Sequence, residues 1–152
     1  DVIFTGGDLV MDTLECDRDA AHAQWQLVQD VVRANLSIPI EHCIGNHDVW
    51  GWNDRAKFGS ESGFGKRRAL DELKLDKPYR SFERAGWHFI VLDSTHAKDG
   101  NGYTARLDDE QFEWLGDDLA NTLASRTECV SKTCRVNWLL FSSGYTYMVA
   151  TH

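Results

Sequence analysis

Three side chains with metal-binding chemistry follow two short apolar runs of this sequence. Asp8 comes after the run 2–4 and two glycines, while Asn46 and His47 come after a second apolar run and Gly45. They supply a carboxylate oxygen, an amide oxygen and an imidazole nitrogen, all of which are ligands of divalent metals. Two cations about 3.5–4 Å apart, bridged by a carboxylate, can clamp an ester and polarise an attacking hydroxide. The pattern predicts hydrolysis without a covalent intermediate.

Each of these residues also has a plain structural interpretation. Gly-Asp is a common turn pair, and Asn46 and His47 could stabilise a turn through bonds from side chain to backbone. The presence of both motifs favours metal binding by Asp8 and Asn46 over those roles. For Asp48 three roles stay open, namely orienting His47, capping a helix, or acting as a solvated carboxylate.

Two strands and a helix are needed to position these loops. Residues 2–4 are predicted to form a buried strand, and residues 38–44 a second strand that leads into Gly45. Between them, residues 20–36 repeat apolar side chains at helical spacing, and Pro39 ends that helix. Parallel α/β sheets place ligand crevices at the carboxyl ends of their strands, so we expect both loops at one sheet edge.

The rest of the chain continues the alternation of strands and helices. The Gly- and Trp-rich stretch 49–65 predicts a long loop over the site, in which Trp50 and Trp52 form either a substrate wall or packed core. The further predicted elements are a helix at 66–75, a hairpin of strands at 79–84 and 87–93, a helix at 108–123, and a strand at 147–151. Residues 124–147 fit no assignment. We expect one α/β domain over 1–152, with mixed β-sheets sandwiched by helices.

Composition narrows the classes of partner. The chain has 152 residues and a formal net charge of −8, which argues against a broad basic surface for nucleic acid. No apolar run approaches the roughly 18 residues of a membrane-spanning segment. Any export signal would lie upstream of Asp1, so the compartment stays open. Cys43 is predicted to be a small buried hydrophobe, while Cys129 and Cys134 could form a disulfide or remain reduced.

The remaining histidines and acidic residues have simpler interpretations. His22, His42 and His88 are predicted to be surface or satisfied structural residues, and His96 either a loop residue or a substrate contact. The acidic stretch 108–118 predicts a solvated helix face, since it lacks the glycine and the spacing of a calcium loop.

The two loop motifs resemble those of a known family. Gly7-Asp8 followed by Gly45-Asn46-His47-Asp48 is similar to the central motifs of the calcineurin-like metallophosphoesterase superfamily. The stretches 91–94 and 107–115 also resemble bacterial members, and the resemblance covers residues 1 to about 121. It implies the calcineurin-like fold and hydrolysis of a small phosphate ester, either a monoester or a diester.

The resemblance also implies roles for individual residues. Asp8 would bridge two metal ions, Asn46 would bind the second, and His47 would contact the phosphate and assist the leaving group. Asp48 would orient His47, and His152 would be a further metal ligand. The implied cofactors are two divalent or trivalent ions of iron, manganese or zinc, which the mixed oxygen and nitrogen ligands permit.

Two family motifs are absent from this sequence. The Asp-x-His of an earlier strand would lie upstream of Asp1, and the final Gly-His-x-His is missing. We therefore expect a piece truncated at the N-terminus and at the C-terminus, with weak metal binding and little turnover. Two alternatives stay open: a non-catalytic phosphoesterase-like module that binds partners, and an inactive fragment created by truncation or a change of reading frame after Leu123.

Overall fold

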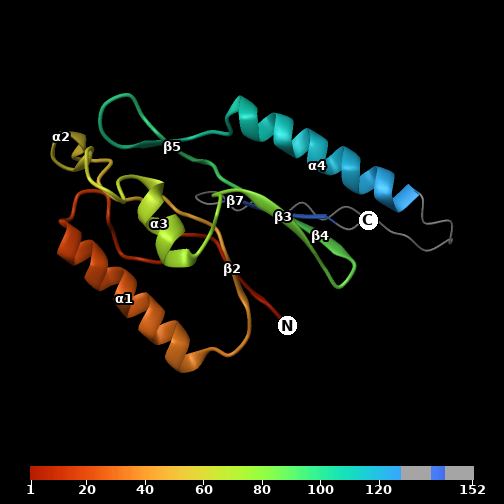
Figure 1. The fold of residues 1–152 in the computed structure, drawn as a ribbon, viewed down its shortest axis with the longest axis horizontal. Coiled ribbons are helices and arrows are strands. Elements are labelled where there is room, and N and C mark those ends of the chain that lie inside the picture. Colours follow the sequence, from red (N-terminus) through yellow and green to blue (C-terminus); the bar gives the residue numbers. More distant parts are fainter. Residues whose placement is uncertain (128–137, 143–152) are drawn as a thin grey trace.

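The structure is a computed structural model that describes residues 1–127 and 138–142, with the side chains of residues 1–123. Within these residues the chain forms four helices and seven strands (Figure 1). In order they are β1 (Ile3–Thr5), α1 (Arg18–Asn35), β2 (Ile40–His42), α2 (Arg55–Phe58), α3 (Lys66–Leu73), β3 (Arg80–Arg84), β4 (Trp87–Leu92), β5 (Thr95–Ala97), β6 (Tyr103–Ala105), α4 (Asp109–Thr127) and β7 (Trp138–Ser142). The predicted strand 147–151, His152, Cys129 and Cys134 lie outside the described residues.

The strands form three small sheets. Strand β1 pairs in parallel with β2, and β5 pairs with β6 as an antiparallel hairpin. Strand β4 lies between antiparallel β3 and parallel β7, so this sheet is mixed. The predicted α/β class is confirmed at this level. The sequence prediction did not include α2, which lies in the stretch 49–65 predicted as a loop, or β5, β6 and β7. Strand β7 falls within the segment that fitted no assignment.

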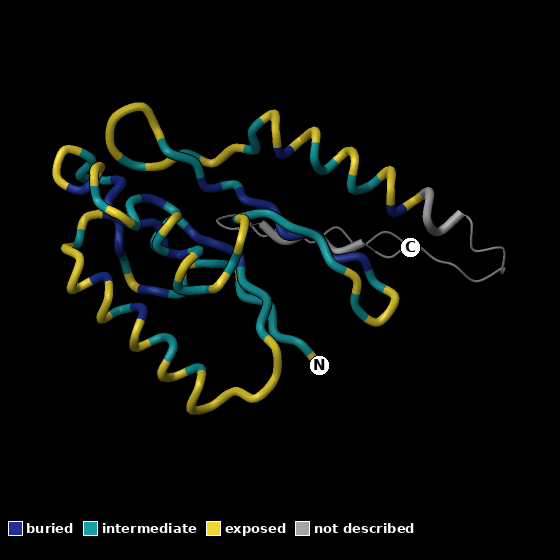
Figure 2. The backbone as a smooth tube through the Cα atoms, in the orientation of Figure 1, coloured by how far each residue is buried: buried dark blue, intermediate teal, exposed yellow. Residues whose placement is uncertain are grey.

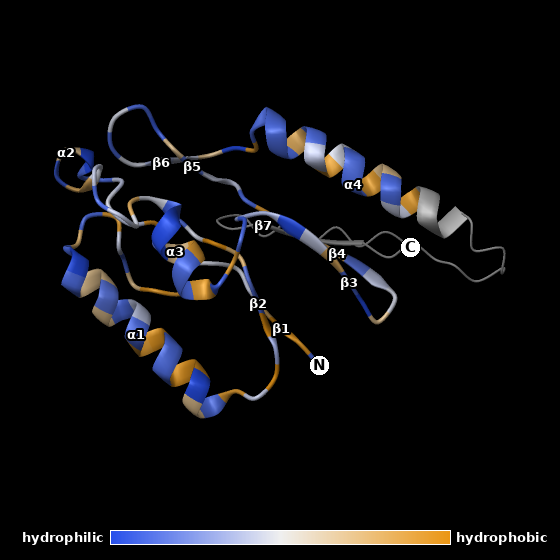
Figure 3. Cartoon of the chain, viewed as in Figure 1, coloured by the Kyte–Doolittle hydropathy of each residue, from blue (hydrophilic) through white to orange (hydrophobic). Residues whose placement is uncertain are grey.

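Helix α1 begins where its sequence offers a cap. The side chain of Asp17 accepts the backbone N–H of Ala20 at 2.8 Å, which satisfies one of the open donors of the first turn. Ala21 and Trp25 are fully buried beneath the helix. Val31, however, is one of the apolar residues of this range and is 54% exposed. Figure 3 shows hydrophilic and hydrophobic residues alternating along α1. Since Leu27 and Val31 are exposed, only part of the apolar pattern meets the core.

The main core lies directly beneath the two loops that carry the candidate site. It joins residues from the segments after β1 and β2 to residues of α1 and α3, namely Val10, Leu14, Trp25, Ile44, Val49, Trp52 and Ala69. Figure 2 shows this buried stretch of chain inside the exposed helix surfaces. Trp50 and Trp52 are both buried, so their interpretation as a substrate wall is wrong and packing is their role.

Helix α4 lies against the β3–β4 hairpin through polar as well as apolar residues. The Asp108 carboxylate accepts the backbone N–H of Gln111, a cap that agrees with the predicted helix start. Gln111 is buried, whereas the neighbouring Phe112 is exposed. Asp118 contacts Ser81 and His88. The acidic face at 108–118 was predicted to be solvated, and at Asp118 that prediction is wrong.

Candidate functional site

The loop after β1 turns sharply to meet the loop after β2. Gly7 has φ of 91° and Asp8 has φ of 52°, a left-handed conformation that is uncommon for a residue with a side chain. A Cβ on Gly7 would lie 2.5 Å from the backbone nitrogen of Gly45, and a Cβ on Gly45 would lie 2.1 Å from Oδ1 of Asp8. The two glycines therefore allow the loops to touch.

The carboxylate of Asp48 fastens the two loops together. Its Oδ2 accepts the backbone N–H groups of Asp8 at 2.9 Å and Gly45 at 2.8 Å. Its Oδ1 accepts those of Leu9 at 2.8 Å and Val10 at 3.2 Å. Asp48 itself is fully buried. Because a buried carboxylate needs several donors, this arrangement both satisfies Asp48 and fixes the backbone of the Gly-Asp loop.

This geometry decides between the roles that were open for Asp48. Full burial excludes the solvated carboxylate, and its acceptor contacts lie in a loop and not at a helix start. Its contacts within the described residues go to backbone N–H groups, so it positions the loops and does not orient the His47 ring by a hydrogen bond. Burial raises the pKa of Asp48, while the backbone N–H groups of Gly45, Val10 and Leu9 oppose that shift.

His47 is oriented by a backbone carbonyl that no sequence pattern identified. Its Nδ1 lies 2.6 Å from the carbonyl oxygen of Met11. A carbonyl can only accept, so Nδ1 donates its hydrogen to Met11 and Nε2 is the ring nitrogen left for a ligand. The side chain of His47 is 40% exposed, so Nε2 can be reached from solvent. A ring held in this way suits a group that contacts a ligand through Nε2.

Several hydrogen bonds to backbone carbonyls join the segment after Asp8 to the segment that begins at His47. Thr13 donates both its backbone N–H and its hydroxyl to the carbonyl of His47, at 2.9 and 2.8 Å. Gly51 and Asn53 donate their backbone N–H groups to the carbonyls of Thr13 and Leu14. Thr13 was missed by the sequence analysis, because nothing in its local pattern distinguishes it from an ordinary loop threonine.

The remaining donor atoms fit part of a metal centre. Oδ1 of Asp8 accepts the backbone N–H of His47 at 3.0 Å, which draws this carboxylate towards the second loop. Within the described part of the chain, the side-chain amide of Asn46 has no hydrogen-bond partner and is available to a ligand. Carboxylate and amide oxygens suit hard or borderline cations. Asp8 and Asn46 are therefore the residues that would hold a metal.

The described residues do not bring together a complete set of metal ligands. Among residues 1–127 and 138–142, no group of three or more His, Cys, Asp or Glu side chains is arranged to hold a metal ion. The amide oxygen of Asn46 adds one donor to the Asp8 carboxylate. Of the three predicted ligands, Asp8 and Asn46 lie among the described residues, and His152 lies outside them.

The other histidines have structural partners. His42 hydrogen-bonds the hydroxyl of Thr5 at 3.0 Å, and burial lowers its pKa. His22 lies 3.3 Å from the Arg68 guanidinium. His88 is buried with carboxylate partners, which confirms its prediction as a satisfied structural residue. His96 lies within β5 and not in a loop as predicted, and its Nε2 lies 3.2 Å from the carbonyl of Asp93.

Comparison with protein-family models and with curated proteins finds no match to this chain. Of the helices in the described residues, none has both the length and the apolar character that crossing a membrane requires.

Proposed function

We propose that this chain carries the central part of a metal-dependent phosphoesterase site. The observation that supports the proposal is the fastening of two strand-end loops by Asp48, which brings Asp8, Asn46 and His47 into one region. The resemblance of these loops to the calcineurin-like metallophosphoesterases agrees with it, and that fold remains part of the proposal. The substrate class is a small phosphate ester.

Each residue has a task that follows from its atoms. The carboxylate of Asp8 and the amide oxygen of Asn46 would hold metal ions, which when bound polarise a phosphate ester and activate water. Nε2 of His47 would contact the phosphate or give a proton to the leaving oxygen, because Nδ1 is committed to Met11. Asp48 keeps the loops in register and contacts no substrate.

The test is metal binding by the purified chain. Manganese is titrated and bound metal is measured for the wild type, for Asp8→Ala with Asn46→Ala, and for a control pair, Asp30→Ala with Asn35→Ala. The control changes the same residue types on exposed positions of α1. We expect weak but saturable manganese binding in the wild type and the control, and its loss in the site variant.

Hydrolysis of an aryl phosphodiester is measured on the same samples with added manganese. Activity that disappears together with bound metal supports the proposal. Equal metal binding in the site variant and the control would overturn the assignment of Asp8 and Asn46. A chain that binds manganese at Asp8 and Asn46 and hydrolyses nothing would contradict catalysis by this chain and favour the binding-module alternative.

A further inference from the structure

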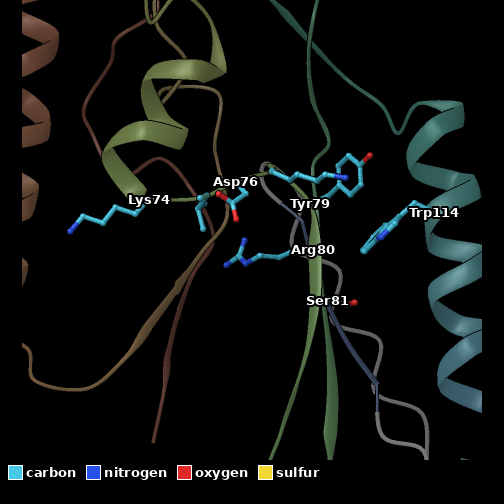
Figure 4. A pocket seen from close by; sticks show the side chains of 8 residues that line it. Lys74, Asp76, Tyr79, Arg80, Ser81 and Trp114 are labelled. Atoms are coloured by element: carbon cyan, nitrogen blue, oxygen red, sulfur yellow. The ribbon is translucent and has the colours of Figure 1, made fainter. Parts of the chain in front are cut away.

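A hollow at the start of β3 lies apart from the two strand-end loops, but its lining does not converge on one ligand. Figure 4 shows Asp76 and Arg80 on the α3 side of β3, with Tyr79 and Trp114 on the α4 side. The guanidinium of Arg80 is already paired with the carboxylate of Glu41 at 2.9 Å. The contact that extends the candidate site lies instead on α1.

Gln24 of α1 holds the backbone of the loop after β1 at two points. Its Oε1 accepts the backbone N–H of Asp12 at 2.9 Å, and its Nε2 donates to the backbone carbonyl of Asp12 at 2.8 Å. A backbone N–H can only donate and a backbone carbonyl can only accept, so these partners fix which end of the amide is the oxygen. Both polar ends of the Gln24 side chain are therefore engaged by this loop.

His47 holds the same two peptide groups through their other ends. The first peptide group joins Met11 to Asp12. Its N–H donates to Gln24 at 2.9 Å, and its carbonyl accepts from Nδ1 of His47 at 2.6 Å. The second joins Asp12 to Thr13, and its carbonyl accepts from Gln24 at 2.8 Å. Its N–H donates to the backbone carbonyl of His47 at 2.9 Å.

The Met11–Asp12 peptide group connects α1 to the His47 ring. A trans peptide group is planar and stiff, so a contact that fixes its N–H also fixes the direction of its carbonyl. That carbonyl is the nearest acceptor of Nδ1, since the carboxylate of Asp12 lies 4.0 Å away. Hydrogen bonds in a chain polarise one another, so the contact of Gln24 with the N–H also strengthens the contact at the carbonyl. The direction of Nε2 therefore depends on Gln24.

The support for Gln24 is a helix and not another loop. Its neighbour Trp25 is fully buried in the main core, and the side chain of Asp17 caps the start of α1. Groups mounted on packed helices are held more precisely than groups on loops. The sequence pattern does not distinguish Gln24 from Gln26, whose side chain donates to Asp30 in an exposed contact.

We propose that Gln24 is a positioning residue for His47, acting through the Met11–Asp12 peptide group. Without Gln24 the Met11 carbonyl can turn away, and the ring then takes up orientations in which Nε2 misses the substrate. The effect on turnover rests on the proposed function, in which Nε2 contacts the phosphate or the leaving oxygen. The effect on the ring does not depend on that function.

The test follows the His47 ring by nitrogen NMR on a chain with isotope-labelled histidine. Spectra are recorded with EDTA at a pH of about 9, where histidine rings are neutral, and His47→Gln identifies the signal. We expect the ring hydrogen on Nδ1 in the wild type, although free histidine prefers it on Nε2. Nε2 carrying the hydrogen in the wild type would overturn the proposal.

Matched variants on α1 separate positioning from stability. Gln24→Met keeps the length of the side chain and removes both hydrogen bonds, so we expect the ratio of the Nδ1–H to the Nε2–H form to fall about threefold or more. Gln26→Met, on an exposed position of the same helix, should leave the ratio unchanged. Thermal unfolding is measured on the same samples. Lower stability of Gln24→Met with an unchanged His47 ring would assign Gln24 to stability alone and overturn the proposal.

Hydrolysis of an aryl phosphodiester distinguishes this proposal from the proposed function. We expect kcat of Gln24→Met to fall about five- to tenfold, because the ring is less well aligned. KM and manganese affinity should stay within about twofold, because Asp8 and Asn46 keep their places. An equal fall of kcat in Gln26→Met would count against Gln24. A wild type without activity would contradict the proposed function, and the NMR result would then decide the role of Gln24.

Discussion

The backbone N–H of Asp8 donates to the carboxylate of Asp48 at 2.9 Å, and the backbone N–H of His47 donates to the carboxylate of Asp8 at 3.0 Å. The loop after β1 thus donates a backbone N–H to a carboxylate of the loop after β2, and the loop after β2 donates a backbone N–H to a carboxylate of the loop after β1. This reciprocal contact fixes the Asp8 carboxylate before any ligand arrives. Groups that are already held in place favour binding because they lose little conformational entropy when the ligand binds.

Removal of the Asp48 carboxylate should destabilise the whole loop pair. Asp48→Ala leaves four buried or half-buried backbone N–H groups without their acceptor, and we expect a loss of about 3–5 kcal/mol in the free energy of unfolding. Urea unfolding followed by circular dichroism measures it. Asp30→Ala, which breaks an exposed pair with Arg33, should cost about 0.5 kcal/mol or less. Similar losses in the two variants would show that Asp48 does not fasten the loops.

The same glycine substitution should have opposite effects at two positions. In Gly45→Ala the new Cβ would lie 2.1 Å from Oδ1 of Asp8, so we expect a loss of about 2–4 kcal/mol and of manganese binding. In Gly116→Ala the new Cβ meets nothing within 4 Å on α4, so we expect a gain of about 0.5–1 kcal/mol. Thermal unfolding of both variants checks the contrast, and a neutral Gly45→Ala would contradict the close approach of the loops.

His47 should affect turnover more than metal affinity. In His47→Gln the side chain loses its proton-transfer group, and we expect hydrolysis of an aryl phosphodiester to fall about 100-fold or more. Manganese affinity should stay within about twofold, because Asp8 and Asn46 are the assigned ligands. Activity and metal binding are measured on one preparation, and a parallel loss of both would instead assign His47 to the metal.

The buried contact between His88 and Asp118 should be a strong link between the β3–β4 hairpin and α4. His88 Nε2 lies 2.6 Å from Asp118, and its Nδ1 lies 2.8 Å from Glu83. A double-mutant cycle with His88→Gln and Asp118→Asn should give a coupling of about 1.5–3 kcal/mol.

The control is a cycle on the exposed Arg67–Asp71 pair of α3, for which we expect about 0.3–0.5 kcal/mol. Unfolding free energies from urea titrations provide both values. Couplings of equal size would mean that burial adds nothing to the contact between the hairpin and α4.

Cys43 should resist alkylation in the folded protein. Burial raises the pKa of its thiol to about 11, and only the thiolate reacts. At pH 8 the thiolate fraction is therefore very small, and it increases only as the pH approaches that value. Iodoacetamide labelling with peptide mass spectrometry should leave Cys43 unmodified in buffer and modified in urea. Rapid labelling of Cys43 in the folded chain would show that its position is not buried.

Local patterns predicted most of the elements that position the site. The strands at β1 and β2, helices α1 and α3, the β3–β4 hairpin and helix α4 were all expected within a few residues of their observed bounds. These elements have either a clear period or a breaker such as Pro39, and both are properties of neighbouring residues. The hairpin of β5 and β6 was missed, because its strands are only three residues long and carry little pattern.

The sequence by itself determined which side chains could serve a site, namely Asp8, Asn46 and His47. Only the tertiary structure decided that Asp48 fastens the loops, that the Met11 carbonyl orients His47, and that β7 pairs with β4. The physical reason is that these contacts join residues far apart in the chain and often use backbone N–H and C=O groups. Every residue except proline carries both groups, so residue type does not reveal which of them will meet.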